Sequence, residues 1–288
     1  MRRPALRLIV ALAMVLALPV VAEAQTLSKT QQQDLRRFAY NNSLFVLYHE
    51  VAHLLFDQLE LPIMGREEDA ADNMATWTLL NKQTAEADRA LADAAEGWIL
   101  SGIAYDSGGH ESDYAAGHSL DKQRAYQIVC LMVGKDEEAF STIADEYEME
   151  NERQDSCFWD YSTVDRALKG LLSGRPDREE SGTEVVVTYH DASGALAAAA
   201  DAFKSSGVFD QVADELRNNY ALEQTVAFNA QRCGEANAYY DPQTVEVIFC
   251  YELMQDYMDL YAANMPEAVP VVPEGSHSGA GRETSSLY

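Results

Sequence analysis

The pentapeptide HEVAH at residues 49–53 constrains this chain more than any other stretch of its sequence. It lies in a segment, residues 28–60, whose apolar side chains recur at spacings of three and four, the pattern of an amphipathic helix. Residues four apart share one face of a helix, so the imidazoles of His49 and His53 point the same way and can bind one Zn²⁺. Glu50 projects beside that metal without binding it, where a general base for hydrolysis is needed. The segment is therefore predicted to be a helix that carries two ligands and a base.

A zinc site needs a third protein ligand, and an acidic run after the turn at Pro62–Gly65 supplies one. Glu68 follows that turn, and Asp72 lies about one helical turn after Glu68. We expect Glu68 to bind the metal and Asp72 to hydrogen-bond the outer nitrogen of a ligand histidine, which such histidines need. The alternative is a solvated acidic helix start, since carboxylates are favoured at helix N-termini. That alternative explains each acid singly but not the position of Asp72 relative to Glu68.

The first 24 residues have the three parts of a secretory signal peptide. They are a basic start, an apolar run at residues 8–22 and the small-residue motif Ala22-Glu23-Ala24. The apolar run is shorter than the ~20 residues that span a bilayer, which disfavours an uncleaved anchor. We therefore predict a signal peptide at residues 1–24, export to the periplasm or the extracellular space, and no stable membrane span after cleavage.

The cysteines agree with export, because their number predicts disulfides. An even number of cysteines in an oxidising compartment predicts disulfides. Three pairings of four cysteines exist, and the sequential one closes the shortest loops. A four-cysteine zinc site is the alternative, but no pair has the close CxxC spacing that such sites favour. The expected disulfides are Cys130–Cys157 and Cys233–Cys250.

The charge of the chain limits its partners. It has 21 Lys and Arg residues against 47 Asp and Glu residues, a formal net charge of −26. Such a charge repels nucleic acids and anionic lipid surfaces, so no nucleic-acid partner is expected. We interpret the acidity as a solvated surface rather than as a site for one basic partner.

The periodicities predict an α+β fold that is mainly helical, with a small mixed sheet and a β-hairpin. Helical spacing dominates up to a linker at residues 173–182, which combines Gly, Pro and charged residues. We expect one domain at residues 25–265, with a sub-boundary at this linker, and a disordered tail at 266–288 that is rich in Pro, Gly and Ser. Helices are expected at residues 28–60 (one long helix or two abutting ones), 67–100 (one helix or one broken in the middle), 121–133, 137–147, 162–172, 196–220 and 251–264. A strand is expected at 183–191 and a hairpin at 237–250.

The pattern HExxH…ExxxD resembles the glutamate-zincin metallopeptidases, of which thermolysin is the familiar example, although the spacing here is shorter. The chain is more closely similar to a bacterial family described as putative metallopeptidases. Three stretches carry this resemblance, which covers most of residues 40–260: FVLYHEVAHLLFDQLELPIMGREEDAADNMAT, HSLDKQRAYQIVCLMVGKD and RCGEANAYYDPQTVEVIFCYEL. The resemblance implies a zincin-like fold, one Zn²⁺ per chain and hydrolysis of peptide bonds in peptide or protein substrates.

His118 is a candidate catalytic residue outside the HEVAH motif. Glutamate-zincins often use a downstream His, Tyr or Arg to stabilise the developing oxyanion. His118 has the best context of the remaining histidines, because Asp121 and Arg124 follow it at helical spacing. The alternative is a histidine that merely caps a helix. Arg124 is expected to pair with acids inside the fold rather than to contact substrate.

The hairpin supplies candidate substrate-binding residues, Asn237, Tyr239 and Tyr240. A strand that carries them is suited to be the edge strand that an extended peptide joins through main-chain hydrogen bonds. Either tyrosine is also suited to donate to an oxyanion. The alternative is an ordinary hairpin, tied by a disulfide, with alternating aromatic residues.

The sequence thus predicts an exported zinc-dependent metallopeptidase in which Glu50 is the general base toward a metal-activated water. The alternative from another class is a non-catalytic, zinc-stabilised binding or scaffold protein that retains the motif. A site with four protein ligands supports the scaffold, whereas a site with one open position supports the enzyme.

Overall fold

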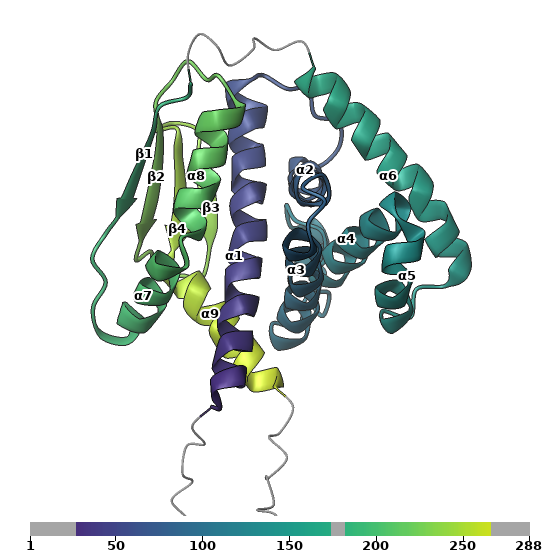
Figure 1. The fold of residues 1–288 in the computed structure, drawn as a ribbon, viewed down its shortest axis with the longest axis horizontal. Helices are drawn as coiled ribbons and strands as arrows, with labels where there is room; N and C mark the ends of the chain where they lie inside the picture. Colours follow the sequence, from purple (N-terminus) through teal and green to yellow (C-terminus); the bar gives the residue numbers. More distant parts are fainter. Residues whose placement is uncertain (1–26, 174–181, 266–288) are drawn as a thin grey trace, which may run out of the picture.

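The structure, a computed structural model of the chain, describes residues 27–173 and 182–265. The predicted signal peptide and the predicted tail at 266–288 therefore lie outside the described residues, as does nearly all of the predicted linker. Within the two described ranges, no helix combines the length and apolar character that crossing a bilayer requires. The fold is α+β and mostly helical, as predicted (Figure 1).

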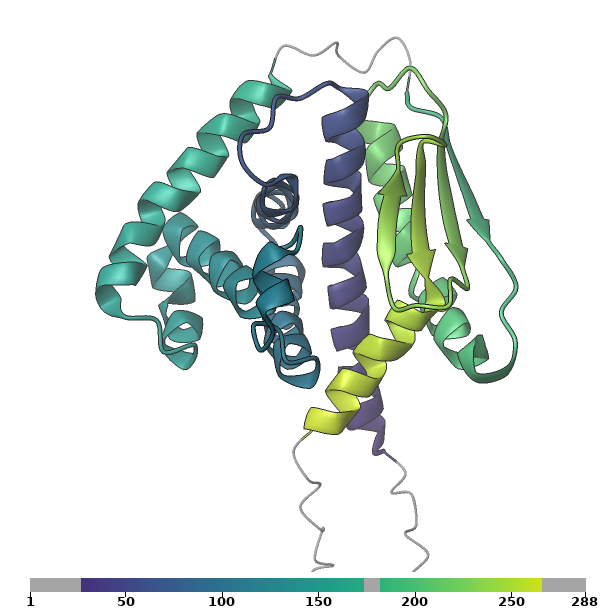
Figure 2. The same cartoon turned by 180° about the vertical axis from the view of Figure 1, so that it is seen from behind.

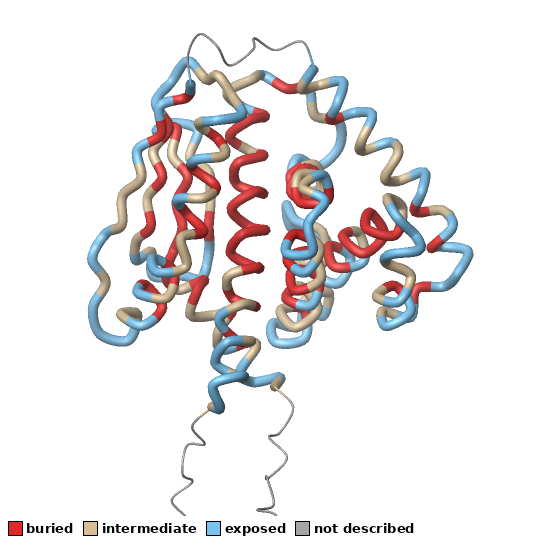
Figure 3. The backbone as a smooth tube through the Cα atoms, in the orientation of Figure 1, coloured by how far each residue is buried: buried red, intermediate tan, exposed pale blue. Residues whose placement is uncertain are grey.

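One long helix, α1 (Lys29–Gln58), stands at the centre, between a helical layer and a sheet layer (Figure 1). Ser28 begins it with a capping box, in which its hydroxyl accepts from the Gln31 amide and the Gln31 side chain accepts from the Ser28 amide. Because other elements pack against α1 on several sides, its middle turns are buried almost all round (Figure 3). The packing therefore takes His49 and Glu50 out of solvent, with exposed fractions of 4% and 6%.

The helical layer follows α1 in the chain. Of the two forms expected for residues 67–100, the broken one is present: the chain turns after Leu80, and Thr84 caps the second helix by accepting a hydrogen bond from the Ala87 amide. The helix expected from residue 162 begins earlier, at Asn151. The elements are α2 (Glu67–Leu80), α3 (Ala85–Ala104), the short 3₁₀ helix η1 (Glu111–Ala115), α4 (Asp121–Lys135), α5 (Glu137–Glu146) and α6 (Asn151–Leu172).

The sheet layer comes after the linker. Its four strands have the order β1-β2-β4-β3, with β1, β2 and β4 parallel and β3 antiparallel to β4 as the predicted hairpin. Sequence analysis missed β2, although its alternating buried residues Val226, Phe228 and Ala230 follow the strand period of two. The strands are β1 (Val185–Tyr189), β2 (Val226–Gln231), β3 (Ala238–Asp241) and β4 (Glu246–Cys250).

Three helices and a short 3₁₀ turn accompany the sheet. The helix expected at 196–220 is divided at Gly207, whose φ of +72° lies in the left-handed region that glycine adopts readily. α9 leaves β4 directly and crosses the lower part of α1 (Figure 2). The elements are η2 (Gly194–Leu196), α7 (Ala197–Ser206), α8 (Val208–Asn219) and α9 (Tyr251–Asn264).

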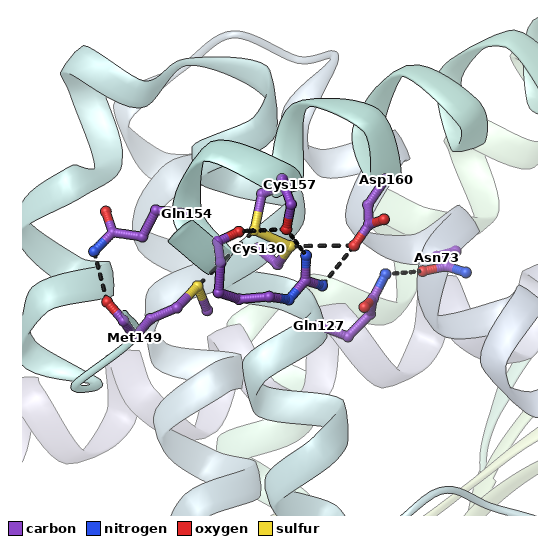
Figure 4. The surroundings of a disulfide bond; sticks show 9 residues. Asn73, Gln127, Cys130, Met149, Gln154, Cys157 and Asp160 are labelled. Carbon is purple, nitrogen blue, oxygen red and sulfur yellow. Dashed lines mark hydrogen bonds and ion pairs between the residues drawn. A yellow bond between two sulfur atoms is a disulfide. The ribbon is translucent and has the colours of Figure 1, made fainter. Parts of the chain in front are cut away.

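Both predicted disulfides are present. Cys130–Cys157 joins α4 to α6 (Figure 4), and Cys233–Cys250 joins the loop after β2 to the end of β4. The first lies where α4 and α6 approach closely, at Gly134. A Cβ atom on Gly134 would lie 2.1 Å from the carbonyl oxygen of Cys157, so only glycine fits there without a backbone shift.

This close approach predicts opposite effects for two glycine substitutions. Gly134→Ala should lower the free energy of unfolding by roughly 1–3 kcal/mol, because the new methyl group pushes α4 and α6 apart. Gly170→Ala on α6 is the matched control, since no atom lies within 4 Å of its Cβ position. It should raise stability by about 0.5–1 kcal/mol through helix propensity. Urea unfolding measures both, and equal stability of the two variants would contradict the packing argument.

Candidate metal centre

Three predicted ligand side chains converge on one point. The Nε2 atoms of His49 and His53 lie 3.1 Å apart, and the Glu68 Oε2 atom lies 3.2 Å from the first and 3.3 Å from the second. The histidines are brought together by the helical period of α1, and Glu68 reaches them from the first turn of α2. The loop between α1 and α2 turns at Gly65, where φ is +98°. The fold thus brings Glu68, which follows His53 by fifteen residues, next to both histidines, and the three side-chain atoms form a triangle.

The triangle has the dimensions of a metal site. Ligand atoms at the corners of a tetrahedron with ~2.0–2.1 Å metal–ligand distances lie ~3.3–3.4 Å apart. The observed edges of 3.1–3.3 Å therefore fit one Zn²⁺-sized ion with little movement. Two neutral imidazoles and a carboxylate are also the donor types that such an ion takes.

His118 lies beside this triangle. Its Nε2 atom is 2.8 Å from Glu68 Oε2, and the ligand atoms of His49, Glu68 and His118 all lie within 4.8 Å of one another. The set that includes His53 makes the tighter triangle, and its two histidines lie on one helix, α1, so it is the better candidate for the ligand set. The His118 side chain is 52% exposed and belongs to the loop before α4. Its backbone carbonyl accepts a hydrogen bond from Arg66.

A buried ion pair supports the first ligand histidine. The Nδ1 atom of His49 lies 2.8 Å from Asp72 Oδ1, which leaves Nε2 facing the triangle. Asp72 in turn accepts two hydrogen bonds of 2.7 Å from Arg124, whose guanidinium lies 3.5 Å from the centre of the Trp98 ring. Burial raises the pKa of Asp72, but Arg124 and His49 lower it to a net value well below the usual range. The His49 ring is therefore held by a permanently charged carboxylate.

A second carboxylate holds the second histidine in the same way. Glu67 Oε1 lies 2.8 Å from His53 Nδ1, so His53 also presents Nε2 to the triangle. Sequence analysis did not assign this role to Glu67, although the adjacent acids at the start of α2 are the signal that points to it. Trp98, which flanks Arg124, carried no signal at all in the sequence.

The protonation of the cluster suits a cation. Hydrogen bonds from His118, His49 and His53 lower the pKa of Glu68 far below its usual range. Burial lowers the pKa of His49, but hydrogen bonds to Asp72 and Glu68 outweigh it and raise the pKa to about 9. Two carboxylates are thus anionic at neutral pH around the imidazoles, and a metal ion would take the place of the imidazole protons.

Glu50 stands next to the triangle without joining it. Its carboxylate is buried, which raises its pKa, while the charges of His49 and His53 and the backbone amide of Tyr240 act in the opposite direction. The net direction is upward. A carboxylate with a raised pKa at the wall of a cleft is suited to accept and return a proton near neutral pH.

A cleft of about 1130 Å³ runs over the cluster. It takes its walls from α1, α3, α9 and β3, and His118 borders it. All three predicted substrate-binding residues, Asn237, Tyr239 and Tyr240, line it. The Tyr240 hydroxyl is already engaged, because it donates to Asp57 Oδ2 at 2.7 Å. Among the described strands β3 pairs with β4 alone and is therefore an edge strand, and it lies next to α1 (Figure 1).

The support of His49 by a buried ion pair generates a prediction. Asp72→Asn should weaken affinity for a divalent metal about 10–100-fold, since the His49 ring loses its anionic partner. It should also lower the free energy of unfolding by roughly 3–5 kcal/mol, because the guanidinium of Arg124 is left buried without a counter-charge. Chelator competition and urea unfolding measure the two effects.

Glu67→Gln is the matched control for this variant. The Glu67 side chain is 56% exposed and pairs with His53 rather than with a buried guanidinium, so its loss should weaken metal binding less and change the stability of the metal-free protein less than Asp72→Asn. Equal stability of the Asp72→Asn variant and the parent would count against the role given to the ion pair.

Comparison with known proteins agrees with this geometry. The profile of the family described as Putative metallopeptidase matches residues 12–172 and 189–277, far more than half of the chain. No curated protein and no solved structure shows significant similarity to the sequence. The three converging ligands, the adjacent carboxylate and this match lead to one conclusion: the chain belongs to the putative metallopeptidase family.

Proposed function

We propose that this protein is an exported zinc-dependent metallopeptidase that hydrolyses peptide bonds with Glu50 as general base. One observation carries the proposal: the ligand atoms of His49, His53 and Glu68 form a triangle with edges of 3.1–3.3 Å, with Glu50 beside it at the wall of a cleft. A set of two histidines and one glutamate is the donor set of hydrolytic zinc sites that keep a position open. Zinc bound there supplies a Lewis acid that polarises the scissile carbonyl and acidifies a water molecule.

The side chains around the triangle divide the remaining work. Glu50 accepts a proton from the attacking water and delivers it to the leaving amine. His118, which borders the cleft next to Glu68, donates a hydrogen bond to the oxygen on which negative charge develops. Asp72 and Glu67 keep the two ligand imidazoles in the orientation that presents Nε2.

The edge strand β3 orients the substrate. An extended peptide that joins the edge strand β3 would lie in the cleft beside Glu50, because the backbone amide of Tyr240 on this strand interacts with the Glu50 carboxylate. Tyr239 on the strand and Asn237 just before it then face the substrate. The Tyr240 hydroxyl instead fixes the strand to the end of α1 through Asp57.

The domain organisation and export complete the proposal. Residues 25–265 act as one domain, since α1 packs against both the helical layer and the sheet layer. The two disulfides fit an oxidising compartment. The substrates are therefore peptides or proteins outside the cytoplasm.

One observation favours a second candidate function. His118 Nε2 lies only 2.8 Å from Glu68 Oε2, close enough to become a fourth ligand. Four protein ligands would close the site and make it structural, as in a zinc-stabilised binding or scaffold protein. The exposure of His118 and the presence of Glu50 at the cleft favour the enzyme.

Substitutions distinguish the proposed general base, Glu50, from the proposed metal ligands. In the zinc-loaded protein, Glu50→Gln should lower peptide hydrolysis by ~10²–10⁴-fold while zinc stays near one per chain, because the amide keeps the shape but cannot accept the proton. His53→Ala should lose zinc and activity together. His118→Ala should keep zinc and lose activity. Cleavage of a peptide library and metal analysis measure these effects.

Glu60→Gln, an exposed acid just beyond α1, is the control for these variants and should behave as the parent. Zinc lost from His118→Ala as readily as from His53→Ala would identify His118 as a ligand and support the scaffold. A Glu50→Gln variant that cleaved as fast as the parent would remove the proposed base.

Export makes a separate prediction. Protein recovered from the periplasm or the medium should begin at Gln25, because signal cleavage is expected after Ala24. N-terminal sequencing or intact mass measures the start of the chain. A chain that accumulated in the cytoplasm and began at Met1 would contradict the assignment.

A further inference from the structure

A tyrosine on α9 lies in the wall of the cleft, outside every motif considered so far. α9 crosses the lower part of α1 (Figure 2) and contributes Leu253, Asp256, Tyr257 and Leu260 to the lining of the cleft. Tyr257 is only 8% exposed. Its ring is therefore fixed by packing, and what remains accessible of the residue borders the cleft.

The Tyr257 hydroxyl makes no hydrogen bond to another residue in the described parts of the chain, 27–173 and 182–265. Over the same parts, every fully buried side-chain nitrogen or oxygen atom does have a partner. The Tyr257 oxygen is therefore not sealed in the core but reaches the surface of the cleft. A polar group that is nearly buried without a partner is destabilising, and a bound acceptor would relieve that cost.

The other tyrosines of the cleft are differently placed. The Tyr105 hydroxyl donates to Asp256, and the Tyr240 hydroxyl donates to Asp57. Tyr239 is more exposed and stands on the edge strand. Tyr257 is thus the cleft tyrosine that is both held rigid and free to donate.

Tyr257 borders the same cleft as Glu50 and Arg124, and both act on it electrostatically. Burial raises its pKa, Arg124 lowers it, and the carboxylates of Asp256, Glu50 and Asp121 raise it, so that the net direction is upward. Glu50 is the proposed base, and Arg124 holds the Asp72 carboxylate that orients His49. The phenol therefore remains a neutral O–H donor at neutral pH, within the electrostatic reach of the base.

We propose that Tyr257 is a catalytic residue whose hydroxyl donates a hydrogen bond to the substrate carbonyl oxygen at the bond being cleaved. The proposal rests on the proposed function, since it needs a peptide bound over the metal centre next to Glu50. A rigid donor aimed at developing negative charge costs no reorganisation during the reaction, which is why such donors stabilise transition states. Tyr257 and His118 would then approach the reacting carbonyl from α9 and from the loop before α4.

Tyr257→Phe tests the proposal in the zinc-loaded, full-length mature protein. We expect kcat to fall by about 100-fold with little change in KM, because loss of one such donor lowers rates by ~10²–10³-fold. Binding of a phosphinic peptide, which imitates the tetrahedral state, should weaken by a similar factor, while binding of a product peptide should not change. Zinc content should equal that of the parent, and the melting temperature should be at least as high, since the hydroxyl has no structural partner.

Tyr251→Phe on the same helix is the matched control. The Tyr251 hydroxyl donates to the His190 carbonyl oxygen at 2.8 Å, so its loss should lower the melting temperature and leave kcat and phosphinic-peptide binding unchanged. A Tyr257→Phe variant within twofold of the parent in both kcat and phosphinic-peptide binding would overturn the proposal. A variant whose activity fell only in step with zinc content or melting temperature would overturn it too.

The two hypotheses fail in different ways. The proposed function itself would be wrong if the parent protein bound no phosphinic peptide and cleaved no library peptide. It would also be wrong if the Glu50→Gln variant kept the activity of the parent. An active parent with an inactive Glu50→Gln variant and an unimpaired Tyr257→Phe variant would remove only the role of Tyr257.

Discussion

The burial of α1 is the constraint on which the rest of this structure depends. A helix packed by a helical layer on one side and by a sheet and α9 on the other must be apolar nearly all round. Yet α1 carries His49, Glu50 and His53 in its buried middle turns. Polar groups are tolerated there only with partners, so the surrounding elements have to supply carboxylates, a guanidinium and an opening toward solvent.

The helical layer supplies the partners. Asp72 on α2 and Arg124 on α4 form a buried pair that ends on His49, and Trp98 on α3 covers the guanidinium. Each member satisfies the next, so the chain of contacts from Trp98 to His49 is as much a part of the core as the apolar residues around it. The position of one imidazole thus depends on three helices that follow α1 in the sequence.

Sequence analysis reached those features that local spacing determines. The period of α1 puts His49 and His53 on one face, the hairpin at 237–250 follows from alternation, and the pairing of four cysteines follows from loop length. Contacts between separate elements were harder to predict from the sequence. Arg124 was expected to pair with acids, but its partner Asp72 could not be chosen before the packing of α2 against α4 was known.

The features that sequence analysis did not predict also depend on contacts between separate elements. β2 was overlooked although it alternates, because only its place between β1 and β4 shows that both neighbours cover it. The early start of α6 depends on packing against α4 at Gly134 and the nearby disulfide, not on a strong periodic pattern. The role proposed for Tyr257 could not be predicted from the sequence. It rests on a hydroxyl without a hydrogen-bond partner among the described residues, and only the three-dimensional packing reveals this.

The edge of the sheet completes the argument for a cleft that receives extended chains. A strand with a free edge invites unwanted pairing, and proteins blunt such edges by keeping them short and covering them. β3 is four residues long, ends at the turn that contains Pro242, and is fixed to α1 by Tyr240 and Asp57. The strand lies along the cleft beside Glu50, with which the Tyr240 amide interacts, rather than on an open face. In the proposed function, the same fixation that protects the strand would set the distance between the peptide and the proposed base, Glu50.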